Sequence, residues 1–223
     1  MPDHHAPSFL QRHADSKLQI ERRILAKWIA GNLVEEGARL FVVSGTTAAA
    51  AGEEILQRVD SVHITTNSVP MAWYFIGLVE KGFAAPHVSV SVVGGELRAV
   101  TGAIAGKAKP ERGATLLISP HGLTAKAITG NRDVDQLKPL VNGHRKVIMP
   151  VSWSKLNREA FGVVKHLGHW KRVDCQLVIT ERPHSSLRLS EEDHRNGIDL
   201  LKSVATTMGN RLTIHWLPLK RGR

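Results

Sequence analysis

Apolar, β-branched segments alternate with segments of helical spacing along most of the chain, and this alternation limits the fold more than any other feature. The pattern predicts strands at 39–43, 62–66, 87–93, 115–119, 146–151, 175–180 and 211–216, and helices at 16–37, 70–79, 134–141 and 191–208. Strands that are separated by helices pair in parallel, and the helices then cover both faces of the sheet. The sequence therefore predicts an α/β fold with a mostly parallel sheet and helices on both faces.

The length and composition suit one domain of this kind. The 223 residues are 42% hydrophobic, which is enough for a single α/β core. We expect a loose arm at 1–15, one folded domain at 16–217 and a basic tail at 218–223. The lone Cys175 excludes an internal disulfide framework. No stretch has the pattern of a membrane span or a secretory signal, so we expect a cytoplasmic protein without membrane contact.

The stretch Ser44-Gly45-Thr46-Thr47 follows the first strand and leads into an alanine-rich segment with helical spacing. The first turn of a helix offers unpaired backbone N–H groups and the positive end of the helix dipole, so this junction suits an anion such as phosphate. Gly45 would let a ligand approach the main chain. The stretch matches neither the P-loop nor the dinucleotide-binding pattern. The alternative is that Ser44 or Thr46 only caps the helix.

Three more polar clusters follow expected strands. They are Thr66-Asn67-Ser68, Gly94-Gly95-Glu96-Leu97-Arg98 and Ser152-Trp153-Ser154-Lys155. Ligands of parallel α/β sheets bind beyond the carboxyl ends of the strands. The coincidence of four such clusters favours an anion site over four unrelated caps.

Several short motifs, in their order and separations, resemble the C-terminal effector-sensing domain of the DeoR family of bacterial transcription regulators. These motifs are Ser44–Thr47, Thr66–Ser68, Gly94–Arg98 with Gly102, Gly122–Thr124, Ser154-Lys155 and Val178–Glu181. The similarity starts near Ser8-Phe9 and covers almost the whole chain. It implies a fold shared with ribose-5-phosphate isomerase, glucosamine-6-phosphate deaminase and CoA transferases, here binding a phosphorylated sugar or a related metabolite. In the family the metabolite controls a DNA-binding domain and an oligomeric assembly, so the resemblance also implies a homo-oligomer.

Pattern and resemblance together give one set of expected ligand-binding residues. The backbone and hydroxyls of 44–47 would hold the phosphate, Arg98 would neutralise it, and Lys155 would supply a second charge. Asn67 and Ser68 would meet the polar body of the ligand. The full set is Ser44, Gly45, Thr46, Thr47, Thr66, Asn67, Ser68, Gly94, Gly95, Arg98, Gly102 and Lys155.

The chain departs from the family pattern in two places that bear on regulation. The winged helix-turn-helix of the family does not precede Ser44, since only about forty residues do, so we expect no sequence-specific DNA binding by this chain and a separate DNA-binding chain as a partner. A stand-alone sensor, a separated domain and a truncated product all fit this pattern. The family's Asp-His before Ser-Lys is Ser152-Trp153, which alters the usual sugar contacts but keeps Lys155.

The alternative function is that of an enzyme with the same fold, either a sugar-phosphate isomerase or deaminase or a CoA transferase. Isomerisation requires a general base, and the related isomerases supply carboxylates from the loop that corresponds to 119–122. That loop offers only His121 here, while Glu181 and Glu96 are the remaining candidate acids. We therefore expect a binding domain and no catalytic residues.

The remaining charged and metal-binding patterns are weak. A formal net charge of +10 favours anionic partners without choosing among them. His4-His5 and the His166/His169 pair lack an accompanying ligand set, so we expect neither a metal nor a cofactor. The basic stretch 165–172 is typical of a solvated surface.

Overall fold

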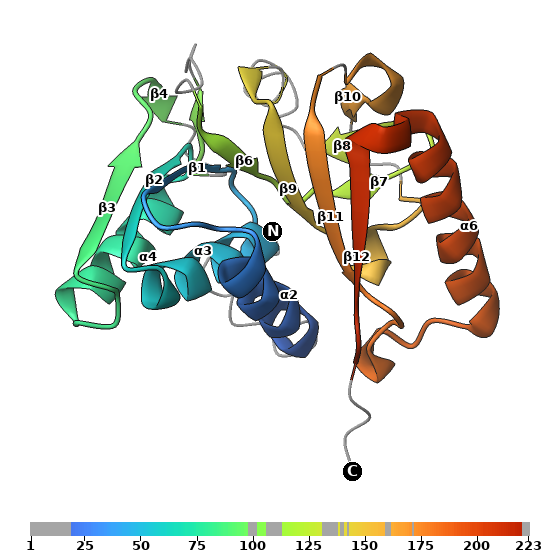
Figure 1. The fold of residues 1–223 in the computed structure, drawn as a ribbon, viewed down its shortest axis with the longest axis horizontal. Helices are drawn as coiled ribbons and strands as arrows, with labels where there is room; N and C mark the ends of the chain where they lie inside the picture. Colours follow the sequence, from blue (N-terminus) through green and yellow to red (C-terminus); the bar gives the residue numbers. More distant parts are fainter. Residues whose placement is uncertain are drawn as a thin grey trace, which may run out of the picture.

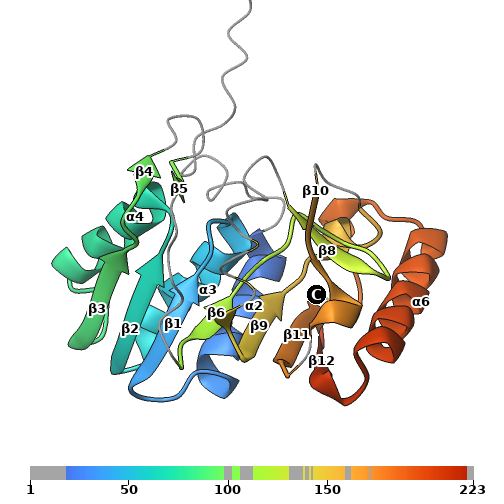
Figure 2. The ribbon, with the colours of Figure 1, turned by 90° about the horizontal axis from the view of Figure 1, so that it is seen from above.

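A computed structural model describes residues 19–97, 102–105, 113–130, 138, 141, 143–158, 162–170 and 172–219. Its centre is a seven-stranded sheet in the order β12-β11-β9-β6-β1-β2-β3, and every pair of neighbouring strands is parallel (Figures 1 and 2). The strands are β1 (Ala38–Val42), β2 (Ser61–Thr66), β3 (His87–Val92), β6 (Thr115–Leu117), β9 (Lys146–Pro150), β11 (Asp174–Thr180) and β12 (Leu212–Leu217). All seven expected strands are present, with small shifts at their ends.

Helices lie on both faces of the sheet, as the sequence predicts. One face carries α2 (Gln19–Asn32), α3 (Thr46–Arg58) and α4 (Val69–Glu80), and the other carries α6 (Glu191–Met208) (Figure 1). Short 3-10 helices are η2 (Trp153–Lys155), η3 (Leu167–His169), η4 (Ser185–Leu187) and η5 (Gly209–Arg211). The predicted α/β fold class is confirmed.

Alternate residues of the strands build two separate cores. In β1, Leu40 and Val42 face α2, α3 and α4, where they meet Ile29 and Ile55. Phe41 faces the opposite side, and Leu201 of α6 belongs to the core there. Such alternation follows from the two-residue period of a strand, and it makes both faces of the central strands apolar.

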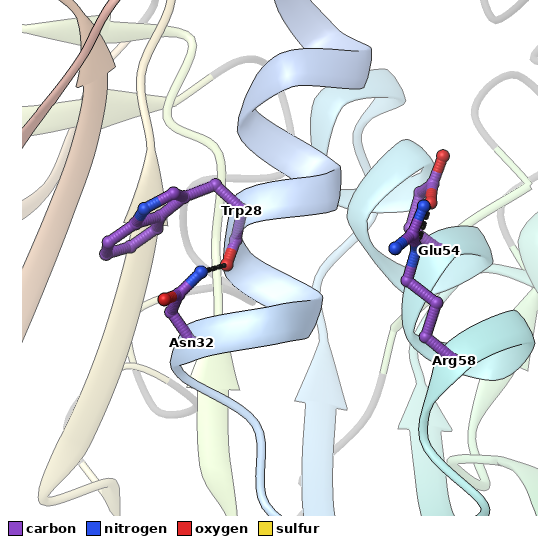
Figure 3. A network of polar contacts seen from close by, with 4 residues as sticks. All are labelled: Trp28, Asn32, Glu54 and Arg58. Carbon is purple, nitrogen blue, oxygen red and sulfur yellow. Dashed lines mark hydrogen bonds and ion pairs between the residues drawn. The ribbon is translucent and has the colours of Figure 1, made fainter.

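Local signals fix the ends of several helices. The Ser68 hydroxyl accepts a hydrogen bond from Met71 N at 3.4 Å, with Pro70 in the first turn of α4. Ser190 and Asp193 form a reciprocal capping box at the start of α6. At the end of α2, Asn32 donates from Nδ2 to Trp28 O at 2.8 Å, and the Arg58–Glu54 ion pair lies within α3 (Figure 3).

The structure also contains strands that the sequence pattern does not predict. β7 (Gly122–Leu123), β8 (Ala127–Gly130) and β10 (Gly162–His166) form an antiparallel sheet, and β4 (Glu96–Leu97) pairs with β5 (Ile104–Ala105). The small three-stranded sheet packs with α6 on one face of the central sheet, because its Leu123, Ile128 and Val164 belong to the same core.

Some expectations fall on residues that the structure leaves out. Most of the expected helix at 134–141 lies outside the described residues, although 138 and 141 are described and are helical. The arm at 1–15 and most of the tail at 218–223 also lie outside them. Among the helices that are described, none combines the length and apolar character needed to cross a membrane.

The contact between α3 and α4 depends on a glycine. A Cβ atom on Gly52 would lie 2.5 Å from Phe75 Cζ, so Gly52→Ala should lower the free energy of unfolding by about 1–3 kcal/mol through overpacking. Gly31 in α2 is the control, because nothing lies within 4 Å of its Cβ position and Gly31→Ala should raise stability by up to about 1 kcal/mol. Urea unfolding of both variants measures the difference. An equal increase in the free energy of unfolding in both variants would contradict the close contact between Gly52 and Phe75.

Candidate functional site

The turn between β1 and α3 presents an uncapped helix N-terminus. Gly45 is the N-cap residue, and no side-chain hydrogen bond caps α3 in the described part of the chain. The first helical bond runs from Ala49 N to Gly45 O at 2.8 Å. The N–H groups of 46–48 precede this bond, so they are the donors that a helix leaves for a ligand or for water. The alternative interpretation, in which Ser44 or Thr46 caps the helix, is not what the structure shows.

Gly45 leaves open space beside the main chain. Its φ of 162° is extended backbone, which any residue adopts, so the conformation does not call for glycine. A Cβ atom at this position would touch only Ser119 O, at 3.8 Å. Since the fold tolerates a side chain here, the space next to the N–H groups is available to a bound molecule.

Asn67 links this turn to the loop that follows β2. Its Oδ1 accepts a hydrogen bond from Ser44 N at 3.0 Å, and the residue is only 1% exposed. Its Nδ2 group is buried and has no hydrogen-bond partner in the part of the chain that the structure describes. A buried polar group without a partner costs about 1–3 kcal/mol, so it needs an explanation. An acceptor on a ligand at the turn would satisfy this donor.

Other predicted site residues form hydrogen bonds and packing contacts that hold the loop after β2 in place. Thr66 is fully buried, and its hydroxyl accepts from Ser68 N at 3.2 Å. Gly102 O accepts from Val69 N at 3.0 Å, and Ile104 N donates to Asn67 O at 2.7 Å, so the segment 102–105 lies against the loop after β2. Gly102 has a φ of 66°, and a Cβ atom there would lie 2.6 Å from Pro70. Both the positive φ and the contact with Pro70 therefore require glycine at position 102.

The remaining predicted residues are spread along the carboxyl edge of the sheet. Gly94 and Gly95 are exposed and follow β3, the outermost strand on that side. Lys155 follows β9, which is two strands away from β1, or about 10 Å at the usual strand spacing. Arg98 lies outside the described residues. The structure thus brings together 44–47, 66–68 and 102, while Lys155 stands apart from them.

Lys155 lies in a cationic neighbourhood. Burial lowers the pKa of its ammonium group, and the nearby Arg158 and Arg22 lower it further. The structure shows no ion pair or hydrogen bond for the Lys155 side chain among the described residues. Positive charges that gather at the strand ends favour an anionic ligand.

Glu21 is a buried residue at the carboxyl edge of the sheet, and the sequence pattern did not predict its role there. Its carboxylate is 1% exposed and accepts from Ser152 Oγ at 2.6 Å, from Trp153 N at 3.3 Å and from Thr180 Oγ1 at 3.3 Å. Burial raises the pKa of this carboxyl, and the three hydrogen bonds oppose that rise. These interactions join the first turn of α2 to the loop that follows β9 and to the last residue of β11.

The sequence contains a pattern from which the burial of Glu21 could have been predicted. Glu21 and Arg22 fall on the helical stripe that continues through Leu25 and Ile29, so two charged residues occupy core-facing positions. A charge on a buried stripe indicates a buried polar network. The same network explains Ser152-Trp153, because Ser152 binds Glu21 and the Trp153 indole donates to Thr180 O at 2.9 Å.

The pH dependence of stability tests the burial of Glu21. A carboxyl whose pKa is raised in the folded state favours folding most when it is protonated, so its contribution falls as pH rises from the ordinary value of 4.5 through the folded value. Glu21→Gln should lose this fall, and the exposed control Glu181→Gln should keep it. Urea unfolding between about pH 4 and pH 8 measures the effect, at about 1.4 kcal/mol per unit of pKa shift. If the free energy of unfolding varied with pH in the same way in the wild type and in Glu21→Gln, the raised pKa of Glu21 would be contradicted.

Comparison with known proteins agrees with the motif pattern. Residues 19–182 match the family described as the DeoR C terminal sensor domain. A search of the curated proteins found no match.

Two solved structures with similar folds are ribose 5-phosphate isomerases A. The isomerase from Methanocaldococcus jannaschii has a TM-score of 0.43 and 15% identity, with 68% of this chain and 57% of that chain covered. The isomerase from Neisseria gonorrhoeae has a TM-score of 0.41 and 11% identity, with 63% and 54% covered. The matched part of this chain spans a little over half the length of each isomerase.

Proposed function

The chain belongs to the DeoR C-terminal sensor-domain family, and from this and the geometry of the strand ends we propose that it binds a phosphorylated sugar or a similar anionic metabolite as a regulatory effector. The phosphate would lie at the N-terminus of α3, against the backbone N–H groups of 46–48 and the hydroxyls of Ser44 and Thr46. The buried Asn67 amide would donate to a ligand oxygen.

The unpartnered Asn67 amide is the observation that carries the proposal. A helix N-terminus alone has many structural explanations, and the buried Asn67 donor beside it is a second, independent observation that supports a ligand. The open space at Gly45 lies at the same turn. One group with several acceptor oxygens could occupy the space at Gly45 and accept hydrogen bonds from both the α3 N-terminus and the Asn67 amide, and phosphate is such a group.

Lys155 would supply the second charge of the site. It lies about two strand spacings from the α3 N-terminus, so it would meet a part of the ligand remote from the phosphate on Gly45. Arg98, Gly94 and Gly95 remain proposed contacts from the β3 side of the same edge.

A thermal-shift and calorimetry screen against sugar phosphates tests this function. Ribose 5-phosphate, glucose 6-phosphate and fructose 6-phosphate are compared with their unphosphorylated sugars and with inorganic phosphate. A ligand at a hundred times its dissociation constant stabilises the native state by about 2.7 kcal/mol. Asn67→Asp keeps the acceptor for Ser44 N but replaces the free donor with a negative group, and Gly45→Val fills the space at the turn. Both should weaken binding by about 10–100-fold.

Asn32→Asp is the matched control for these variants. It makes the same change from amide to carboxylate at an exposed residue that ends α2 and precedes β1, away from the carboxyl ends of the strands, so it should retain ligand binding. Unchanged affinity in both Asn67→Asp and Gly45→Val, for a ligand that binds the wild type, would place the binding site elsewhere. A wild-type protein that no phosphorylated sugar stabilises would contradict the ligand class.

We further propose binding without turnover. Glu96 and Glu181 are exposed, and the Glu21 carboxylate already accepts three hydrogen bonds from its own chain. None of these carboxylates therefore has the placement of a general base that faces a bound sugar. An isomerase or deaminase of the same fold is the alternative function.

Regulation would act through a DNA-binding element other than the domain described here, such as a separate chain. DNA binding by this chain should then be sequence-indifferent and should fall steeply with salt, because only phosphate contacts contribute. Titration of an operator-like duplex and a shuffled duplex between about 50 and 200 mM salt measures both properties. A clear preference for one duplex that persists at the higher salt would contradict this part of the proposal.

A further inference from the structure

The large hydrophobic residues that stay exposed gather at one end of the sheet. Nine such residues occur in the described part of the chain, and seven of them belong to the segment 69–97. Trp73 is 76% exposed and Phe83 is 62% exposed. The other five are Val69, Ile76, Val79, Val92 and Leu97. We call these seven residues the α4/β3 surface, and exposed apolar patches of this kind mark interaction sites.

The helix α4 is apolar on all sides. Its inner side buries Met71 and Phe75 against the sheet, while Val69, Trp73 and Ile76 follow one another at i, i+4 and i+7 on the outer side. An ordinary surface helix carries polar residues on that outer stripe, whereas a helix that is apolar all round is buried. The outer side of α4 therefore has the composition of a buried face.

The charge of this region points to a second copy of the chain. Residues 69–97 contain only Glu80, Lys81 and Glu96 as charged residues, whereas 22% of the whole chain is charged. Nucleic acids and anionic membranes both attract surfaces rich in lysine and arginine, which this one lacks. A two-fold contact places the same patch on both sides, so in a chain of net charge +10 it must be nearly neutral to avoid self-repulsion.

The strand β3 offers a second, independent contact next to α4 (Figure 2). It is an outermost strand of the sheet, and its sequence, HVSVSV, contains no lysine, acid or proline of the kind that protects open edges. His87 N and Val93 N donate toward β2, to Asp60 O and Thr66 O, so the N–H groups of the alternate residues 88, 90 and 92 face the open edge.

This strand is also self-complementary. An antiparallel pair with its two-fold axis at Val90 would set Val92 opposite Val88 of the second copy, and Ser89 opposite Ser91 of the second copy. Valines then meet valines on the side of α4, and serines meet serines on the other side. Because α4 flanks β3 on one face, the same axis would bring the two α4 helices together.

We propose that the α4/β3 surface joins two copies of this chain in a two-fold dimer, with the β3 strands paired antiparallel and the outer sides of α4 in contact. Trp73 and Phe83 alone supply roughly 200–340 Å² of the about 800 Å² that each partner buries in a standard interface. The five aliphatic residues and the paired strands add to this area. The dimer does not depend on the proposed ligand.

Sedimentation velocity of the full chain between about 1 and 100 μM tests the dimer. The wild type should sediment at twice its chain mass of 24.5 kDa. Trp73→Ser removes the most exposed side chain of the patch, and Val92→Pro removes an N–H that faces the open edge without breaking a bond to β2. Each should raise the dimer dissociation constant at least tenfold.

Trp216→Ser is the matched control, because Trp216 is an exposed tryptophan on β12, the outermost strand at the other end of the sheet. It should leave the dimer unchanged. Phe83→Ser replaces Trp73→Ser as the test of the patch if circular dichroism shows that the latter variant is unfolded. A wild type that stays monomeric at every concentration would overturn the proposal. So would a dimer that Trp216→Ser dissociates while the folded patch and edge variants leave it intact.

Discussion

The hydrogen bond from Ser44 N to Asn67 Oδ1 holds together the part of the molecule on which the proposed function depends. It joins the loops after two neighbouring parallel strands, so the start of α3 and the buried amide share one location. The amide can bond in this direction only with its oxygen toward Ser44, which leaves its N–H₂ group without a partner among the described residues. A stabilising contact inside the domain thus creates the donor that a ligand would use.

The Glu21 network gives the same edge of the sheet a second fixed point. Its carboxylate binds groups from the loop after β9 and from the last residue of β11, while its helix packs against α3. Burying this carboxylate has a cost that its hydrogen bonds only partly offset, as the raised pKa shows. Replacing it with a residue that cannot accept hydrogen bonds would remove the acceptor of Trp153 N and of the Ser152 hydroxyl. The first turn of α2 is therefore tied directly to the strand ends.

The sequence predicts the parallel sheet and its two helical layers well, because period and turn residues depend on neighbours along the chain. It also places the Ser44 turn at the start of a helix, but it assigns Ser68 to the ligand and does not predict the cap that the Ser68 hydroxyl forms on α4. It misses the antiparallel strands around Gly122, Ala127 and Gly162, because two- to five-residue strands carry too little pattern to separate from loops. Glu21 is missed for another reason, since its partners are more than a hundred residues away and only the fold reveals them.

The site and the α4/β3 surface lie at different places on one sheet, and they expose different kinds of chemical group. At the strand ends the unsatisfied groups are polar and buried, so they suit a small ligand that brings its own acceptors. At the β3 end the exposed groups are apolar side chains and open-edge N–H groups, so they suit a protein surface with the same properties. The loop after β2 is shared by both, because it holds Asn67 and also begins α4 with Ser68. A change in this loop would therefore act on the ligand donor and on the position of the outer helix together.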